Sequence, residues 1–291
     1  MQTLDDSVRV TLKDRLEAIE KYFDADAVFF FGPIYPGVEK RFRDFIEPLR
    51  HDGAEKGRSR LVALLNTPGG SAETVEKLVD IIRFHYREVF FVVPDSAMSA
   101  GTIFCMSGDR IYMDYSSSLG PIDPQVYNGK EWVPALGYLD QVEKMIKKSA
   151  ANQLTNAELI ILQNLDLAML SRYEQAKNLA ITLLKKWLVE FKFKDWTAHG
   201  TDPDKKNSPV TAEEKERRAE DIAAKLSDNK HWHSHGRMIS ASTLRLHLRL
   251  AINDYSDDRV LTQLIRDYND LLVDYVMRQG YSTFLHSRNY F

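Results

Sequence analysis

The sequence predicts an α/β fold in which helices cover a parallel sheet, followed by a second half that is mostly helical. Two observations support this prediction. Short runs of strand-forming apolar residues alternate with amphipathic helical segments between residues 11 and 114. From about residue 136 onward, the apolar periodicity is helical almost throughout. The alternation in the first half is typical of β-α-β units, whose strands run parallel.

The expected strands are three apolar runs and one shorter segment, at residues 27–31, 60–66, 89–93 and 110–114. Continuous apolar runs of this length indicate strands that are covered on both faces. Between and before them, helices are expected over residues 11–23, 38–47, 71–86 and 98–107. The second of these helices should end at Pro48, because the residue before a proline disfavours the helical conformation.

In the second half, helices are expected over residues 156–189, 211–226, 240–250 and 257–277, with a polar surface loop over 195–209. The first of these segments is long enough for one kinked helix or for two helices. Thr155 with Glu158, and Thr211 with Glu214, have the spacing of capping boxes. We therefore divide the chain into an α/β core, residues 1–135, and a helical part, residues 136–291.

The composition excludes several classes of protein. The chain has 291 residues, of which 44% are hydrophobic and 28% charged, as in ordinary globular proteins. A net charge of −3 gives no general reason to expect a nucleic-acid partner. The single cysteine, Cys105, excludes a disulfide framework and a multi-cysteine zinc site. With no secretory signal, membrane-length apolar run or nucleotide-binding glycine motif in the sequence, we expect a cytoplasmic protein without membrane partner or cofactor.

Two glycine-containing turns follow the second and third strands. They are Asn-Thr-Pro-Gly-Gly at residues 66–70 and Ala-Met-Ser-Ala-Gly-Thr at residues 97–102. Since the carboxyl ends of parallel strands meet at one edge of a sheet, both turns should lie together. Ser99, between small residues at a strand-to-helix turn, can act as a nucleophile. Gly70 can bring its N–H to the same point, because no Cβ obstructs the approach. Taken singly, each turn is an ordinary structural feature.

Together these turns resemble the Clp protease/crotonase superfamily. The separation of 29 residues between Gly70 and Ser99 fits the serine peptidases of that superfamily. The segment Ser-Leu-Gly-Pro-Ile-Asp-Pro-Gln at residues 118–125 resembles the serine dehydrogenase proteinase (SDH proteinase) group, which is related to signal peptide peptidase A. The resemblance covers residues 27–125 and is looser beyond, where His-Gly-Arg at residues 235–237 also resembles the group. It implies a Clp/crotonase-like parallel sheet and a soluble serine endopeptidase, with Ser99 as nucleophile and the N–H groups of Gly70 and Ala100 as oxyanion hole.

The same resemblance implies a peptide or unfolded protein as substrate and a homo-oligomeric assembly. We expect Gly69 and Asp123 to line the substrate cleft, although Asp123 could equally cap a turn. An apolar stripe on the last helix could form the interface between copies or pack on the core; its members are Leu261, Leu264, Ile265, Tyr268, Leu271, Leu272 and Tyr275. The alternative function is a non-peptidase crotonase-fold enzyme or binding scaffold that uses the same paired N–H groups without a nucleophile.

The general base is the least determined part of the site. No histidine occurs between Ser99 and residue 133, which favours a Ser-Lys dyad as in the signal peptide peptidase A relatives. Their lysine lies some 50 residues after the serine in a Lys-Ser-Ala-like segment, and Lys148 begins such a segment here. Helical geometry favours Lys147 instead, since it would border the buried face. We choose Lys148; the alternatives are Lys147, Lys144, Lys177 and, if a histidine serves, His199, His233 or His235.

Three alternating histidines, His231, His233 and His235, raise the possibility of a zinc site, because on an extended strand they would face one side. No carboxylate pattern accompanies them, and the resemblance attaches to His235 without a metal. We therefore expect no metal site, and we expect His235 and Arg237 to form a hydrogen-bonded junction between the C-terminal helices and the core.

Overall fold

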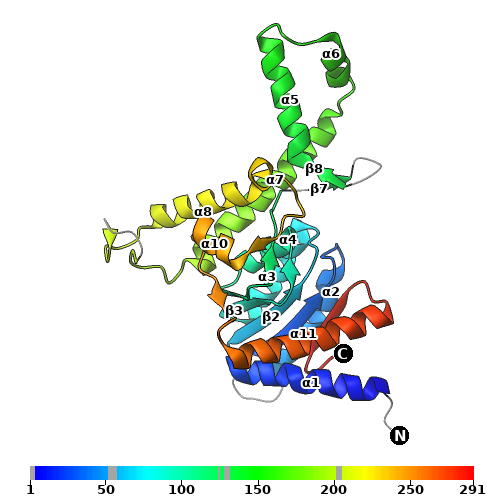
Figure 1. Ribbon diagram of the computed structural model, residues 1–291, viewed down its shortest axis with the longest axis vertical. Coiled ribbons are helices and arrows are strands. Elements are labelled where there is room, and N and C mark those ends of the chain that lie inside the picture. Colours follow the sequence, from blue (N-terminus) through cyan, green and yellow to red (C-terminus); the bar gives the residue numbers. More distant parts are fainter. Residues whose placement is uncertain (1–3, 52–57, 124, 128–131, 201–204) are drawn as a thin grey trace.

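The computed structural model describes residues 4–51, 58–123, 125–127, 132–200 and 205–291. A six-stranded sheet with the order β10-β5-β3-β2-β1-β11 forms the centre of the molecule (Figure 1). Its strands are β1 (Asp26–Phe31), β2 (Arg60–Asn66), β3 (Glu88–Val93), β5 (Arg110–Met113), β10 (Asn253–Asp254) and β11 (Phe284–Ser287). All neighbours pair in parallel except β11, which runs antiparallel to β1. The α/β fold predicted from the sequence is confirmed.

Helices cover both faces of the sheet, because alternate residues of the buried strands point to opposite sides. On one face, Phe29 and Val62 pack against α1 (Leu4–Phe23) and α11 (Arg259–Gln279). The apolar stripe of α11 is used in this packing on the core. On the other face, Val28 and Phe30 belong to a larger cluster that includes α2 (Val38–His51), α3 (Ala72–His85), α4 (Ala100–Met106) and α7 (Leu167–Trp187).

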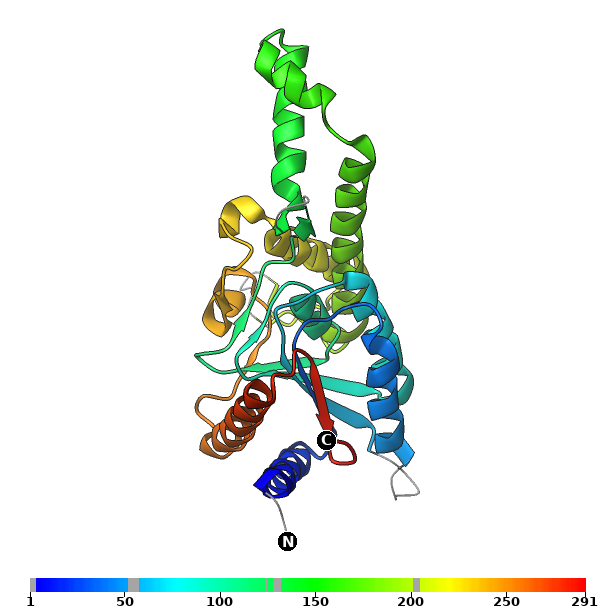
Figure 2. The same cartoon turned by 90° about the vertical axis from the view of Figure 1, so that its right-hand side faces the viewer.

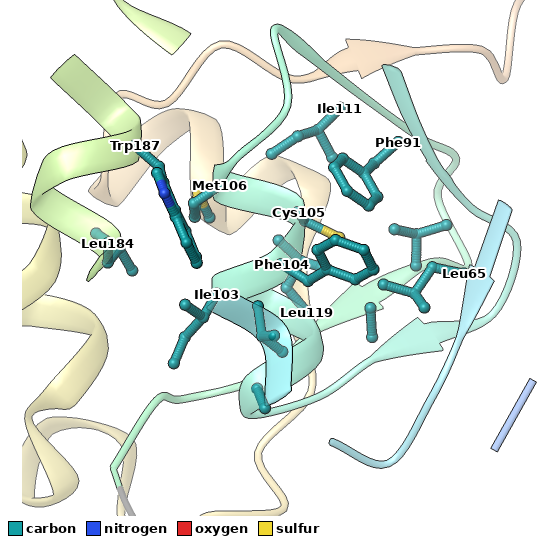
Figure 3. Packing of buried hydrophobic residues seen from close by; sticks show 14 of the residues in the cluster. Leu65, Phe91, Ile103, Phe104, Cys105, Met106, Ile111, Leu119, Leu184 and Trp187 are labelled. Carbon is teal, nitrogen blue, oxygen red and sulfur yellow. The ribbon is translucent and has the colours of Figure 1, made fainter. Parts of the chain in front are cut away.

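The short helix α4 lies at the centre of this larger cluster (Figure 3). Its side chains Ile103, Phe104, Cys105 and Met106 are each at most 2% exposed. Figure 3 shows them between strand residues such as Phe91 on one side and Trp187 of α7 on the other. Helix α4 is therefore held from both sides, and the residue that precedes it, Ser99, is fixed by this packing.

The remaining helices are α5 (Ala135–Ala150), α6 (Asn156–Gln163), the π-helix η1 (Leu188–Lys192), α8 (Ala212–Ser227), α9 (Asn229–Trp232) and α10 (Ala241–His247). Both predicted capping boxes are present, at the starts of α6 and α8. Helices α5 and α6 rise well away from the sheet, and α7 returns alongside α5 to the body (Figure 2). We call residues 135–170 the arm. A hairpin of β7 (Gln125–Tyr127) and β8 (Trp132–Pro134) lies at its base.

Two sequence predictions differ from the structure. Helix α2 does not end at Pro48 but continues to His51. A proline in the last turn removes only one backbone donor, and this turn retains Leu49 in the core. The division of the chain at residue 135 does not separate sheet from helices, because β10 and β11 return to the central sheet. Strands of two and four residues are too short to show a periodicity in the sequence.

Candidate active site

A second, three-stranded sheet brings three distant chain segments together. It consists of β4 (Ser96–Ala97), β6 (Ser118–Leu119) and β9 (Ile239–Ser240), in that order. Strand β4 is parallel to β6, and β9 is antiparallel to β6. The carboxyl ends of β4 and β6 therefore lie at the same edge as the amino end of β9. Ser99 follows β4, Asp123 follows β6 and His235 precedes β9, so all three leave the small sheet at one edge.

Ser99 has an unusual backbone conformation, with φ of 53° and ψ of −116°. A non-glycine residue adopts a positive φ only at a cost of about 1–3 kcal/mol, and such residues are concentrated at functional sites. Ser99 precedes α4, but its hydroxyl does not cap the helix and forms no hydrogen bond within the described part of the chain. The side chain is half-buried. The hydroxyl is therefore held at a fixed place and is free to react.

The glycine turn after β2 lies beside Ser99. Thr67 pairs with Ala97 in a parallel bridge, with Met98 N–H donating to the Thr67 carbonyl at 3.0 Å. On its other side, Gly70 pairs with Ile34. The backbone N–H groups of Gly70 and Ala100 have no acceptor among the described residues. Two unpaired backbone donors beside a serine hydroxyl are the elements from which an oxyanion hole is built.

Close packing explains why both positions of the turn are glycine. Gly69 has φ of 104° and Gly70 has φ of 149°, which side chains rarely tolerate. A Cβ on Gly70 would lie 1.9 Å from the Ile34 carbonyl oxygen, and one on Gly69 would lie 2.8 Å from the Ser99 Cβ. The absence of side chains is thus what allows the turn to approach Ser99.

His235 and Asp123 form a hydrogen-bonded pair, with 2.9 Å between His235 Nδ1 and Asp123 Oδ1. The carboxylate is 1% exposed, and the imidazole is 22% exposed. In the neutral imidazole, a hydrogen bond to an ionised carboxylate requires the proton on Nδ1, which leaves Nε2 as the acceptor. The Asp123 segment is anchored in turn, because Ile122 N–H donates to the Leu226 carbonyl of α8 at 3.0 Å. This pair forms the junction that the sequence predicted for His235, and it orients the ring.

A cavity of about 750 Å³, which we call the catalytic cavity, contains Ser99, Ala100, Gly69, Gly70 and His235 in its lining. Most of its other lining is apolar and includes Ile34, Tyr35, Ile103, Ile122, Ala176, Leu179 and Ala180. The volume falls within the range of small-molecule and substrate pockets. A serine, an imidazole and two unpaired N–H donors therefore line one apolar cavity, although no hydrogen bond joins Ser99 to His235 in the described structure.

The structure does not bring the predicted lysine base to this cavity. None of the described residues that line it is a lysine. Lys148 lies in the arm, where its amine donates to Glu158 at 2.5 Å and holds the pKa of that carboxyl at about 2. Lys147 pairs with Glu143 on the exposed face of α5, and Lys144 is also exposed. Lys177 is half-buried next to Ala176, outside the cavity lining.

The other histidines of the sequence prediction have different surroundings. His231 packs edge-to-face on Trp232, and His233, with φ of 62°, ends α9. Over the described residues, no group of three or more histidine, cysteine or acidic side chains could hold a metal ion.

Of the helices in the described ranges, none combines the length and apolar character that a membrane span requires.

Comparison with known proteins identifies the family. The model of the ClpP-like SDH-type serine proteinases matches residues 29–222, more than half of the chain. The chain belongs to this family. The matched range includes Ser99 and Asp123, and His235 lies beyond it.

Two curated relatives come from Methanocaldococcus jannaschii, and both are uncharacterised proteins. MJ0137 is 28% identical over 171 residues, which is 58% of this chain and 55% of the relative. MJ1495 is 30% identical over 102 residues, which is 35% of this chain and 34% of the relative. The chain thus spans about half or less of the length of the curated relatives it matches.

Among solved structures, the chain is similar to two variants of the 1510-N membrane-bound stomatin-specific protease. The first variant aligns with 14% identity and a TM-score of 0.46, over 81% of this chain and 82% of the other. The second, in complex with a substrate peptide, has 14% identity and a TM-score of 0.44, over 81% and 78% of the two chains.

The sequence predicts Ser99 and the glycine turn as site residues, and the structure places both in one cavity with His235, whereas the base chosen from the sequence is Lys148. A histidine base is expected shortly after the serine in the chain, whereas His235 follows Ser99 by 136 residues. It reaches the site only because β9 pairs with β6. Two features of the sequence point to this pair: Asp123 and residues 235–237 both lie in segments that resemble the SDH proteinase group. Nothing in the sequence shows that the two segments lie together in the fold.

Proposed function

We propose that this protein is a serine endopeptidase in which Ser99 is the nucleophile, His235 the general base and Asp123 the residue that orients His235. The observation that supports this assignment most strongly is the small sheet, which releases all three residues at one edge. The family supports the reaction class, because its members are serine proteinases.

In the proposed reaction, Nε2 of His235 takes the proton of the Ser99 hydroxyl while Oγ attacks the carbonyl carbon of the scissile peptide bond. The N–H groups of Gly70 and Ala100 stabilise the oxyanion that forms. The imidazolium then gives its proton to the leaving amine, which departs and leaves an acyl-enzyme. Water, deprotonated by His235, hydrolyses this ester and restores Ser99. Throughout, Asp123 keeps the ring in the tautomer that has Nε2 as acceptor.

The substrate we propose is a peptide or an unfolded protein segment with an apolar side chain next to the cleaved bond. The apolar lining of the catalytic cavity beside Ser99, which includes Ile103 and Leu179, supports this preference. Burial of such a side chain contributes about 1.5–3 kcal/mol, which the enzyme can use to position the bond.

We further propose that the protein assembles as a homo-oligomer. The arm supports this, because it carries exposed apolar side chains far from the sheet: Ile146, Leu159, Ile160, Ile161 and Leu167 are each 44–76% exposed. Light scattering should give a mass of two or more chains. The monomer mass at micromolar concentration would contradict the proposal.

A fluorophosphonate probe, which reacts with activated serines, tests the proposed nucleophile. We expect the wild-type protein to be labelled at Ser99 and to cleave an apolar fluorogenic peptide, and the Ser99→Ala variant to do neither. Ser71, which also lines the catalytic cavity, supplies the matched control, because the Ser71→Ala variant should still be labelled. Equal labelling of the wild type and the Ser99→Ala variant would contradict the assignment.

A further inference from the structure

A second cavity of about 560 Å³, which we call the basic cavity, shares no lining residue with the catalytic cavity. Its lining comes from the end of η1 and the segment after it, from α8, and from the turn after α10. It is also different in character, since charged and aromatic side chains provide most of its lining.

Positive charge is in excess here. The described lining holds five lysines and arginines but only two acids. Of these acids, Glu214 is already occupied: it accepts from Lys205 at 2.6 Å, contacts His199 at 3.1 Å and completes the capping box of α8. The other acid, Asp221, is the one whose charge favours the protonated form of Arg218. The acids are therefore engaged with part of the cationic set.

Three cations of the basic cavity have no acid of its lining as a direct partner. Within the described residues, the side chains of Lys192, Arg217 and Arg249 form no hydrogen bond and no ion pair, although Asp109 and Glu213, outside the lining, act on Lys192 and Arg217 at longer range. Burial lowers the pKa of the Lys192 amine to about 8, against the charge of Asp109, which raises it. The positive charge of Arg249 lowers the pKa of Arg218. The lining thus carries more cations than acids, and a bound anion would offset the excess positive charge.

Aromatic rings line the same cavity. Trp196 packs edge-to-face with Phe193 on one side and with His199 on the other, with centroid separations of 5.6 Å in both cases. These residues lie directly after η1, a π-helix, and such helical irregularities are frequent at functional sites. The lining of the cavity thus contains aromatic rings as well as cations.

We propose that the basic cavity binds a nucleoside phosphate. The phosphate groups would be held by Lys192, Arg217 and Arg249, and the base would pack on Trp196 and Phe193. The cavity volume suits a ligand of this size. This site goes beyond the peptidase function and does not depend on it.

Calorimetric titration of the full chain with ATP, ADP, pyrophosphate and adenosine tests the proposal and separates its two parts. We expect ATP and ADP to bind with micromolar affinity that weakens as salt is raised, because the phosphates provide charge. Pyrophosphate should bind at least tenfold more weakly, and adenosine weakly or not at all. Absence of heat with both nucleotides at millimolar concentration would overturn the proposal. Equal affinity for pyrophosphate and ATP would overturn the role of the base.

Variants locate the binding. We expect Lys192→Met and Arg249→Ala to weaken ATP at least tenfold, and Trp196→Leu to weaken ATP but not pyrophosphate. Arg278→Ala, which removes an exposed arginine of α11, is the matched control and should bind ATP as the wild type does. Lys192→Met should not lower the melting temperature, because it removes a charge that burial disfavours. Unchanged ATP affinity in both Lys192→Met and Arg249→Ala would show that the nucleotide does not bind here.

Discussion

At the scale of single residues, Ser99 combines backbone strain with an unbonded hydroxyl. A positive φ suits glycine, so Ser99→Gly should relieve the strain, whereas Ser99→Ala should retain it. We expect Ser99→Gly to be more stable than Ser99→Ala by about 1 kcal/mol, and both variants to lack peptidase activity. Urea unfolding of the two variants checks this. Equal or lower stability of Ser99→Gly would show that the strain is not relieved there.

Gly70, whose N–H belongs to the proposed oxyanion hole, is predicted not to tolerate a side chain. Gly70→Ala places a Cβ 1.9 Å from a backbone oxygen, so this variant should lose about 2 kcal/mol or more of unfolding free energy as well as activity. Gly37 provides the control, because it also has a positive φ, 101°, but nothing within 4 Å of its Cβ position. Gly37→Ala should therefore lose only about 1 kcal/mol, the cost of the backbone conformation alone. Similar losses in both variants would mean that the turn at Gly70 can shift.

A site residue can be predicted from the sequence when a local pattern positions it, and not when a long-range contact does. Ser99 and Gly70 lie in turns directly after long buried strands, so local patterns place them at one edge of the sheet. His235 is placed by a pairing between residues 118–119 and 239–240, and no local pattern encodes such a long-range contact. Lys148 had the spacing found in relatives, but its helix extends away from the sheet in the arm.

At the scale of elements, Thr102 connects α4 to the segment that carries Asp123. Its hydroxyl accepts from the Gly120 N–H at 2.9 Å and lies 2.8 and 2.9 Å from the Ala97 and Gly120 carbonyl oxygens, between which its single proton is shared. Thr102→Val keeps the shape but leaves these buried groups unsatisfied, which should cost about 2–3 kcal/mol of unfolding free energy.

The same connection should matter for catalysis, because it fixes the distance from Ser99 to the Asp123 segment. We expect Thr102→Val to lower kcat/KM about tenfold or more. Thr262→Val is the matched control: it removes a single hydrogen bond, to the Tyr255 carbonyl, and should cost about 1 kcal/mol without changing activity. Full activity in Thr102→Val would contradict a positioning role.

The long elements were predictable and the short ones were not. Buried strands such as β2 and amphipathic helices such as α3 repeat their pattern often enough to be recognised. The strands β4, β6 and β9 have two residues each, and two residues carry no period. The three-stranded sheet beside the candidate site is made of these short strands, which explains why the fold is easier to predict than the complete site.

At the scale of the whole molecule, His286 should make the protein sensitive to acid. It lies in β11, is 1% exposed, and lies 2.7 Å from the Tyr268 hydroxyl. Burial lowers the pKa of His286 to about 3, against about 6.5 in an unfolded chain. The folded state therefore keeps His286 neutral while the unfolded chain takes up a proton. This contribution to stability is complete above pH ~6.5 and is lost progressively as the pH falls toward 3.

Urea unfolding at pH 7 and pH 5 measures this effect. Between these values, the wild type should lose about 2 kcal/mol more unfolding free energy than His286→Gln, which cannot take up the proton. Whether His286→Gln is itself less stable at pH 7 does not matter, because the readout is the difference in pH dependence. The same pH dependence in both proteins would show that His286 does not control acid stability.

The most direct test of the proposed site compares kcat/KM for peptide cleavage in His235→Gln and Lys148→Met with the wild type from pH 5 to 9. A model imidazole gains its proton near pH ~6.5 and a model amine near ~10.4, so the two kinds of base give different acid limbs. We predict an acid limb of the imidazole kind, a loss on the order of 10³-fold or more in His235→Gln, and less than about a threefold change in Lys148→Met. An inactive Lys148→Met beside an active His235→Gln would contradict the account.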